Sequence, residues 1–299
     1  MDNKFPKHHL CLISGSADLK ELKGYERHYL VKSKPTGFVF CSRIPAKQEL
    51  TDYYNKYPRQ GDCPSAIRRR YRELLEEFEP YRNSNKILDV GCGDGFFLEE
   101  AKKLGWEAHG TEYSDEATEI CKSKNIEVKC GALNDLSYPE NFFDVVTSFE
   151  VIEHINNPVE TVSAMRKVVR KGGLVYVTTP NFNALSRYIL KDRYNIIEYP
   201  EHLCYYTPRT LTYLFENNGF RERKIRTTGF SISRLRRSLL ADRSKNIPAL
   251  ETNRNSNADS ALLSKSQTNI IVGSLMSVTN YFLNMLGIGS SLKGWYIKN

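Results

Sequence analysis

The sequence lacks both the cysteine pattern of a secreted domain and an apolar segment at its N-terminus. Its seven cysteines are an odd number, scattered along 299 residues, and do not form a disulfide framework. Residues 1–6 hold no apolar run of the kind that forms the core of a signal peptide. We therefore expect a cytoplasmic protein with reduced thiols, with the inner face of the membrane as an alternative position.

Internal repeats are absent too, and the composition is that of an ordinary globular protein. Hydrophobic residues make up 40% of the chain and charged residues 26%, which excludes disorder of the whole chain because the apolar content can form a core. The length suits one large domain or one domain with appendages. The net charge of +8 favours anionic partners, although solubility alone explains it equally well.

The middle of the chain alternates between buried strands and amphipathic helices. Strands that alternate with helices argue for an α/β fold, with a parallel sheet covered by helices on both faces. The predicted strands are 30–32, 37–40, 86–90, 106–111, 126–130, 143–148, 173–179 and 220–227, and the predicted helices are 66–78, 96–104, 115–124, 159–170 and 210–217.

A glycine-rich loop follows the strand at 86–90. It reads Asp89-Val90-Gly91-Cys92-Gly93-Asp94-Gly95, so its spacing is Gly-x-Gly-x-Gly and not the Gly-x-Gly-x-x-Gly of dinucleotide enzymes. Ligands of such sheets bind beyond the carboxyl ends of the strands, and glycine lets the backbone turn sharply and approach a ligand closely. Glu112 closes the next strand, where its carboxylate can accept hydrogen bonds from both hydroxyls of a ribose. The loop alone could be a tight turn, but with Glu112 it predicts a cofactor site.

Four motifs between residues 87 and 220 resemble those of class I S-adenosylmethionine-dependent methyltransferases. Taken together they are highly specific, and the resemblance covers nearly half of the chain. The motifs are Ile87-Leu88-Asp89-Val90-Gly91-Cys92-Gly93, Phe143-Asp144-Val145-Val146, Val151-Ile152-Glu153-His154 and Lys171-Gly172-Gly173-Leu174.

The resemblance implies a seven-stranded, Rossmann-like sheet with helices on both faces, together with a small N-terminal β module at 1–60. The methyltransferase core is expected at 61–230. Residues 292–299 would form the last strand, inserted antiparallel into the sheet, with 231–291 interrupting the final hairpin. The polar stretch 231–260 suggests a flexible insertion.

The cofactor contacts of the family can be carried over by position. Gly91 and Gly93 would lie against the methionine part of S-adenosylmethionine, Asp89 would help to orient its ammonium group, and Glu112 would hold the ribose. The complete cofactor-binding set is Asp89, Gly91, Cys92, Gly93, Gly95, Glu112, Tyr113, Ala132, Leu133 and Glu150.

One departure from the family concerns the adenine end of the cofactor. Tyr113 and Leu133 would flank the ring. The family usually offers an aspartate to the adenine amino group after the third strand, but residues 131–133 are Gly-Ala-Leu here. That contact therefore falls to the backbone, or to Asn134 or Asp135.

Transfer of a methyl group to a hydroxyl needs a base as well as alignment. The sulfonium already makes the methyl group transferable, so the protein supplies orientation and a dry site, and a base removes the proton of the acceptor. Two of the six histidines are placed for this role: His154 after the fourth core strand, and His202 in the long connection that roofs the acceptor pocket in this fold. Glu153 completes the candidate catalytic set, and no metal is expected. The simpler interpretation is that Glu153 and His154 cap a helix and that His202 is a surface residue.

The acceptor is harder to predict than the cofactor. The sequence resembles bacterial methyltransferases that act on sugars in surface-polysaccharide or nucleotide-sugar pathways, and methyltransferases of quinone-precursor phenols are related. We therefore expect O-methylation of a sugar, sugar nucleotide or glycan, with a phenol as the alternative. Tyr194, Tyr199, Tyr205 and Tyr206 could form a wall for a sugar ring or could pack in the core.

Two other function classes stay open. The chain could bind the cofactor without turnover, as a scaffold. It could also methylate nucleic acid, which the basic stretches 68–70 and 221–245 favour, but no Asn-Pro-Pro-Tyr-type motif follows the fourth core strand.

A stretch without any charge, 266–292, lies near the C-terminus. It predicts a helix at 268–288 that docks on a membrane surface or on a partner, such as a second copy. Its Asn, Ser and Gly content argues against a transmembrane span, and packing on the protein's own sheet is the alternative. The residues expected on its apolar face are Ile271, Leu275, Val278, Phe282 and Met285, and those on a polar face are Ser277, Asn280 and Asn284.

The N-terminal module resembles a zinc ribbon that has lost its ligands. In the relatives, two Cys-x-x-Cys knuckles precede the methyltransferase domain, whereas the corresponding residues here are 11–15, Cys-Leu-Ile-Ser-Gly, and 33–37, Ser-Lys-Pro-Thr-Gly. Only Cys11 remains of four thiolates, and Ser and Thr hydroxyls do not replace charged thiolates around zinc. We expect no zinc, and a module held by apolar packing through Leu30, Phe38 and Phe40.

Overall fold

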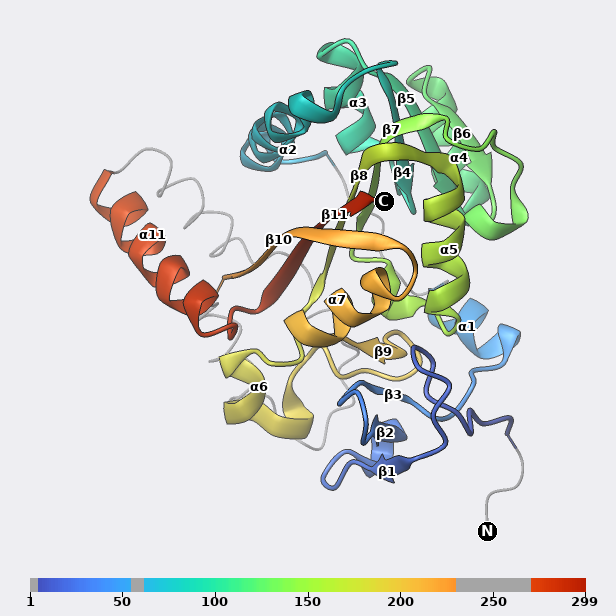
Figure 1. Ribbon diagram of the computed structural model, residues 1–299, viewed down its shortest axis with the longest axis vertical. Coiled ribbons are helices and arrows are strands. Elements are labelled where there is room, and N and C mark those ends of the chain that lie inside the picture. Colours follow the sequence, from blue (N-terminus) through green and yellow to red (C-terminus); the bar gives the residue numbers. More distant parts are fainter. Residues whose placement is uncertain (1–4, 55–61, 230–269) are drawn as a thin grey trace.

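The computed structural model describes residues 5–54, 62–229 and 270–299, without the side chains of 47, 51, 54 and 270–277. The predicted flexible stretch 231–260 lies outside these residues. The described part contains a large mixed sheet with helices packed around it and a small antiparallel sheet at one end (Figure 1).

The large sheet has seven strands in the order β10-β11-β8-β7-β4-β5-β6. Strands β4 to β8 are parallel, and β11 runs antiparallel to both of its neighbours, β8 and β10. This confirms the predicted α/β class and the antiparallel insertion of the last strand. The strands are β4 (Lys86–Val90), β5 (Glu107–Glu112), β6 (Glu127–Cys130), β7 (Phe143–Phe149), β8 (Val169–Pro180), β10 (Phe220–Thr228) and β11 (Ser291–Lys298).

Helices cover both faces of this sheet, and successive strand residues face opposite layers. Ile87 and Val145 belong to the core shared with α2, α3 and α4, whereas Leu88 and Val146 belong to the core shared with α5 and α7. Because side chains alternate along a strand, a strand that is buried on both faces is apolar throughout. The helices are α2 (Ser65–Phe78), α3 (Phe96–Lys103), α4 (Asp115–Ser123), α5 (Pro158–Val168) and α7 (Pro208–Glu216).

One predicted boundary is wrong. The helix expected over 159–170 ends at Val168, and β8 begins at Val169 instead of residue 173. The Arg170 guanidinium donates to the buried carboxylate of Asp144, with 2.8 Å between Nε and Oδ1, and to the carbonyl oxygen of Tyr81 at 2.6 Å. These contacts to distant segments hold the chain extended here, and helical periodicity does not show them.

The small sheet joins the N-terminal module to the connection after β8. It has the order β1-β2-β3-β9, and β9 (Cys204–Tyr205) pairs with β3 through Val39 and Phe40. The two predicted strands of the module are confirmed as β2 (Leu30–Ser33) and β3 (Val39–Cys41). The elements β1 (Leu19–Glu21), β9, α1 (Lys47–Tyr54) and α6 (Leu185–Leu190) were not predicted.

The two knuckle segments of the N-terminal module face each other. The amide of Gly15 donates to the carbonyl of Cys11, and the amide of Gly37 donates to that of Ser33, each at 2.8 Å. The sulfur of Cys11 lies 3.9 Å from Oγ1 of Thr36. Leu30, Phe38 and Phe40 are buried, as predicted. Phe38 also contacts the ring of Tyr206, so apolar packing links the module to the connection after β8.

The predicted helix near the C-terminus is confirmed as α11 (Ile270–Met285). It precedes β11 and lies at one side of the molecule (Figure 1). In the part of the chain that the structure describes, we find no helix with the length and apolarity needed to span a membrane.

Candidate active site at the carboxyl ends of the parallel strands

The glycine loop between β4 and α3 has a backbone that only glycine adopts easily. The φ angles of Gly91, Gly93 and Gly95 are 72°, 52° and 75°, all in the left-handed region. A Cβ at Gly91 would come within 2.6 Å of the Val151 side chain, and one at Gly95 within 2.8 Å of the Cys121 sulfur. A Cβ at Gly93 would meet no described atom within 4 Å. Gly93 therefore borders space from which a ligand can approach the backbone.

The carboxylate of Glu112 is fixed beside this loop. Its Oε2 accepts from the amide of Gly93 at 2.9 Å, and its Oε1 accepts from the amides of Tyr113 and Ser114 at 2.8 and 3.0 Å. A carboxylate has about four acceptor positions, so lone pairs remain for hydroxyl donors. This geometry fits the predicted contact with a ribose.

Asp89 is a buried carboxylate that fits a cationic ligand. It is 2% exposed, accepts from Oγ1 of Thr147 at 2.7 Å, and forms no ion pair with any residue in the described ranges. Burial raises the pKa of Asp89 to about 7, and nearby Glu112 adds to the increase while the bond from Thr147 opposes it. An ammonium group beside Asp89 would stabilise the ionised carboxylate. The ammonium of S-adenosylmethionine is such a group.

The predicted adenine contacts lie at the ends of two adjacent strands. Tyr113 follows β5 and is 74% exposed, whereas Leu133 follows β6 and is buried. The amide of Gly131 donates to the carbonyl of Glu112 at 2.9 Å, which brings the two strand ends together. Asn134 and Asp135 are exposed beside Leu133 and remain candidates for the contact that the missing aspartate would make.

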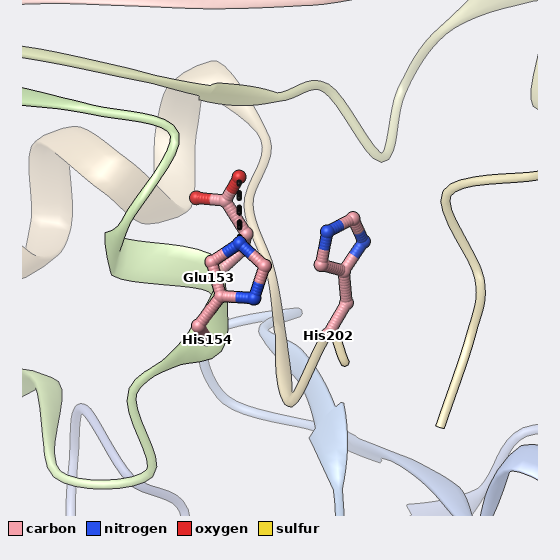
Figure 2. Close-up of side chains that lie close together, drawn as sticks. All are labelled: Glu153, His154 and His202. Carbon is pink, nitrogen blue, oxygen red and sulfur yellow. Dashed lines mark ion pairs between the residues drawn. The ribbon is translucent and has the colours of Figure 1, made fainter. Parts of the chain in front are cut away.

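The structure brings the three predicted catalytic residues together (Figure 2). Glu153 and His154 lie in a short 3-10 turn (Ile152–His154) after β7, and His202 comes from the connection after β8. The ring centroids of the two histidines are 4.7 Å apart. The amide of Leu203 donates to the carbonyl of Glu153 at 2.8 Å, and Oγ1 of Thr179 donates to its carboxylate at 2.9 Å. The cluster lies at the same edge of the sheet as Gly91, because Val151 packs against that glycine.

Burial favours the uncharged form of each member of this cluster. Burial and the neighbouring Glu150 raise the pKa of Glu153. Burial and the neighbouring His202 lower the pKa of His154, although a quarter of that side chain is exposed. Burial also lowers the pKa of His202 to about 4. The 3.9 Å approach of His154 Nε2 to Glu153 Oε1 is therefore an ion pair only after a proton has reached the histidine.

Hydrogen bonds assign different roles to the two histidines. The Nδ1 atom of His202 lies 2.5 Å from the carbonyl oxygen of Ile196. A carbonyl only accepts, so Nδ1 carries the hydrogen and Nε2 keeps a lone pair that has no hydrogen-bond partner among the described residues. The Nδ1 atom of His154 likewise donates to a carbonyl, that of Glu201 at 2.7 Å, but its Nε2 faces the carboxyl group of Glu153, 3.9 Å from Oε1. His202 is therefore better placed to accept a proton.

The same three side chains could hold a divalent cation. One oxygen of Glu153 and one ring nitrogen each from His154 and His202 lie within 4.8 Å of one another. Two imidazoles and one carboxylate are a known zinc-binding set, so the expectation of no metal needs an experimental test. Two hollows on the surface of the described residues, of about 740 and 440 Å³, are lined by other residues than this cluster.

Other residues proposed for the acceptor side lie elsewhere. Of the two interpretations of the tyrosines, core packing holds for Tyr194, Tyr205 and Tyr206, which are buried because the small sheet and the connection close over them. Only Tyr199 is partly exposed, and its hydroxyl donates to Oε2 of Glu49 at 3.0 Å. Among the remaining histidines, His109 lies between the carboxylates of β5 and β6, away from the cluster.

Several contributors to the site were not predicted. Thr147 orients Asp89, and Thr179 orients Glu153. Tyr71 on α2 packs against Phe149 at the end of β7, and burial, with Asp89 close by, raises the pKa of its hydroxyl. Threonines in buried strands gave no sequence signal. Tyr71 was visible only as one member of an apolar helix face.

Comparison with known proteins places this geometry in a family. Residues 64–224, more than half of the chain, match the family described as Methyltransferase domain. Two curated relatives are named ubiquinone biosynthesis O-methyltransferase: that of Shewanella sp. (strain ANA-3) is 32% identical over 108 residues, and that of Thiobacillus denitrificans 34% over 109. Each match covers 34% of this chain and 46% or 47% of the relative. The matched region thus spans about half the length of these relatives.

A solved structure shows the same fold. The crystal structure of a SAM-dependent methyltransferase from Archaeoglobus fulgidus superposes with a TM-score of 0.51 at 22% identity, covering 77% of this chain and 94% of that one. The fold, the family match and the glycine loop with Glu112 agree with one another. The chain belongs to the class I S-adenosylmethionine-dependent methyltransferases.

Proposed function

We propose that this chain transfers a methyl group from S-adenosylmethionine to a phenolic hydroxyl of a quinone-precursor type. The observation that carries the proposal is the likeness, over about a third of the chain, to proteins named ubiquinone biosynthesis O-methyltransferases. The sequence alone had favoured a sugar or glycan and kept the phenol as the alternative. The burial of three of the four tyrosines removes one support for the sugar.

The basicity of His202 also favours a phenol. A neutral histidine with a pKa near 4 is a weak base, so the acceptor should release its proton readily. A phenol has a pKa of about 10, as in tyrosine, whereas a sugar hydroxyl holds its proton more tightly. Proton transfer to His202 is therefore less uphill from a phenol.

Different residues would bind the cofactor and accept the proton of the acceptor. Asp89 would hold the ammonium group of the cofactor, Glu112 its ribose, and the backbone around Gly93 would lie against it. The cofactor supplies an activated methyl group on a sulfonium. The acceptor oxygen would bond to that methyl carbon as the carbon–sulfur bond breaks, and Nε2 of His202 would accept the hydroxyl proton. Glu153 and His154 would position the acceptor beside His202.

Methyl transfer from labelled cofactor tests the proposal. The purified chain would be incubated with a dihydroxybenzoate as the phenol probe and with UDP-glucose as the sugar probe, and the products analysed by mass spectrometry. We expect the label in an aryl methyl ether. Label found only in the sugar would restore the sugar acceptor, and tight cofactor binding without transfer to any member of a broad phenol and sugar panel would favour a scaffold.

A further inference from the structure

In the part of α11 whose side chains are described, 278–285, two asparagines turn toward the protein and several large apolar side chains turn toward solvent. Oδ1 of Asn280 accepts from the amide of Gly229, and Oδ1 of Asn284 accepts from the amide of Thr227, each at 2.9 Å. Oγ1 of Thr227 in turn donates to the carbonyl of Leu283 at 2.8 Å. The helix is thus attached to the end of β10 by hydrogen bonds, which is the reverse of a helix that packs its apolar stripe on a core.

The outward side of α11 carries large apolar side chains. Val278, Phe282 and Met285 of the predicted apolar face are 54%, 52% and 61% exposed, and Tyr281 and Leu286 are exposed beside them. Val278, Phe282 and Met285 therefore do not pack on the protein's own sheet, which was the alternative expectation for this face. The side chains of Ile271, Leu275 and Ser277 lie outside the described residues.

Helix α6 begins beside the segment that follows α11. The amide of Leu185 donates to the carbonyl of Ile288 at 2.9 Å, which attaches the start of α6 to the segment that follows α11. Leu185, Tyr188 and Ile189 of α6 are also exposed. We call the exposed side chains of both helices the apolar patch. They are Val278, Tyr281, Phe282, Met285, Leu286, Leu185, Tyr188 and Ile189.

A positively charged groove borders this patch. Met285 and Leu286 line a hollow of about 440 Å³ together with Arg209 and Arg226, and no carboxylate lines it. Both arginines are exposed, and neither forms an ion pair or a side-chain hydrogen bond in the described part of the chain. An apolar surface with free arginines at its edge is the composition that binds at the boundary between headgroups and acyl chains.

We propose that the apolar patch and this groove dock the enzyme on the surface of an anionic lipid bilayer. Phe282, Met285 and their neighbours enter the acyl boundary, while Arg209 and Arg226 bind lipid phosphates. The inference does not depend on which hydroxyl the active site methylates.

The charge of the groove favours a lipid surface over two other binding partners of the patch, a second copy of the chain and the segment 230–269. A second copy of the chain would bring the same arginines without a compensating carboxylate from the groove, so like charges would meet. The segment 230–269 of this chain carries seven basic and three acidic residues, so it too would be repelled by the groove. A surface of lipid phosphates supplies the opposite charge.

Vesicle flotation with the full chain tests the proposal. We expect the protein to float with vesicles of phosphatidylcholine and phosphatidylglycerol, to bind at least tenfold less to phosphatidylcholine alone, and to be released by salt. The double variant Phe282→Ser/Met285→Ser should lose binding, and Arg209→Gln/Arg226→Gln should weaken it by on the order of tenfold. Leu104→Ser, which removes an exposed apolar side chain at the end of α3, should bind like the wild type.

Two controls make the outcomes decisive. Circular dichroism and cofactor binding establish that each variant is folded, since none of these residues lies in the cofactor site. Absence of flotation by the wild type at low salt, or undiminished binding by both double variants, overturns the proposal. So does a dimer in solution that Phe282→Ser/Met285→Ser dissociates while the wild type ignores vesicles, because the patch would then bind a second copy.

Discussion

His154 and His202 face each other with ring centroids 4.7 Å apart and ring planes inclined by 66°, although they come from different connections of the sheet. His154 follows the end of β7 and His202 lies in the connection after β8, so the fold brings both to the edge of the sheet that carries the glycine loop. The sequence offered the two histidines as alternative bases. The structure makes them neighbours and separates their roles, because Nε2 of His154 faces the Glu153 carboxyl group, whereas Nε2 of His202 has no hydrogen-bond partner in the described ranges.

Replacement of His202 should therefore remove the base. We expect His202→Asn to lower kcat by about 10²–10⁴-fold with little change in cofactor affinity. The matched control is His28→Asn, because His28 is also buried, with its pKa lowered to about 4, but lies outside the cluster. Wild-type turnover in His202→Asn, measured from pH 6 to 9, would show that positioning alone suffices.

Dialysis against a chelator distinguishes two roles for the cluster of Glu153, His154 and His202, proton transfer and metal coordination. If His202 acts as a base, activity should survive exhaustive dialysis against a chelator. Activity that disappears and returns with a divalent ion would instead make Glu153, His154 and His202 metal ligands, as their distances allow.

Acid should destabilise the folded protein through its buried histidines. The pKa of His202 is lowered from 6.5 to about 4, so between these values the unfolded chain binds more protons than the folded one. The stability that the neutral, buried His202 contributes to the fold is complete above pH 6.5 and is lost as the pH falls toward 4. For His202 alone this amounts to about 2 kcal/mol between pH 7 and 5. The fall in Tm over this interval should be smaller in His202→Asn than in the wild type, and equal falls would contradict the neutral buried state.

How much of this architecture could be predicted depends on where the determining contacts lie. The alternation of strands and helices and the cofactor loop follow from local patterns, since Gly91, Gly93 and Glu112 belong to consecutive strand–helix units, whereas the antiparallel last strand was implied by the family resemblance. Strand β9 could not be predicted, because a two-residue strand exists only as the partner of β3. The support that Thr147 gives to Asp89 likewise comes from a neighbouring strand.

The orientation of α11 could not be predicted from the sequence either. Its apolar and polar faces were predicted from periodicity, and the helix is there. Which face turns inward depends on Thr227 and Gly229, whose amides bind its asparagines.

Glu112→Ala should weaken the binding of S-adenosylmethionine by about 2–4 kcal/mol, because two charge-assisted hydrogen bonds to the ribose are lost. The structure adds a second cost, since the amide of Gly93 also loses its acceptor. Isothermal titration calorimetry measures the change. Glu107→Ala, at the opposite end of the same strand, is the control and should bind normally. Unchanged affinity in Glu112→Ala would remove the ribose assignment.

Asp89→Asn should stabilise the protein without cofactor and weaken cofactor binding. The pKa of Asp89 is raised from 3.8 to about 7, so its contribution to stability is complete below pH 3.8 and is lost as pH rises through 7. An asparagine avoids the cost of ionisation and can still accept from Thr147. We expect a gain of about 2–4 kcal/mol at pH 8 and little gain at pH 4, measured by denaturant unfolding. A loss of stability at pH 8 would mean that the carboxylate is already compensated.

The last prediction concerns the knuckles of the N-terminal module, which keep their turns but not their thiolates. Elemental analysis of the His202→Asn protein, in which the active-site cluster lacks one ligand, should find no zinc. The triple substitution Ser14→Cys/Ser33→Cys/Thr36→Cys should complete a four-thiolate site with Cys11, because its sulfur already lies 3.9 Å from Oγ1 of Thr36 and both turns are formed. We expect one zinc per triple variant and a Tm that falls on chelation, since such a site contributes on the order of 10 kcal/mol to folding. Zinc in the protein with the native knuckles, lost together with thermal stability on chelation, would refute the metal-free module.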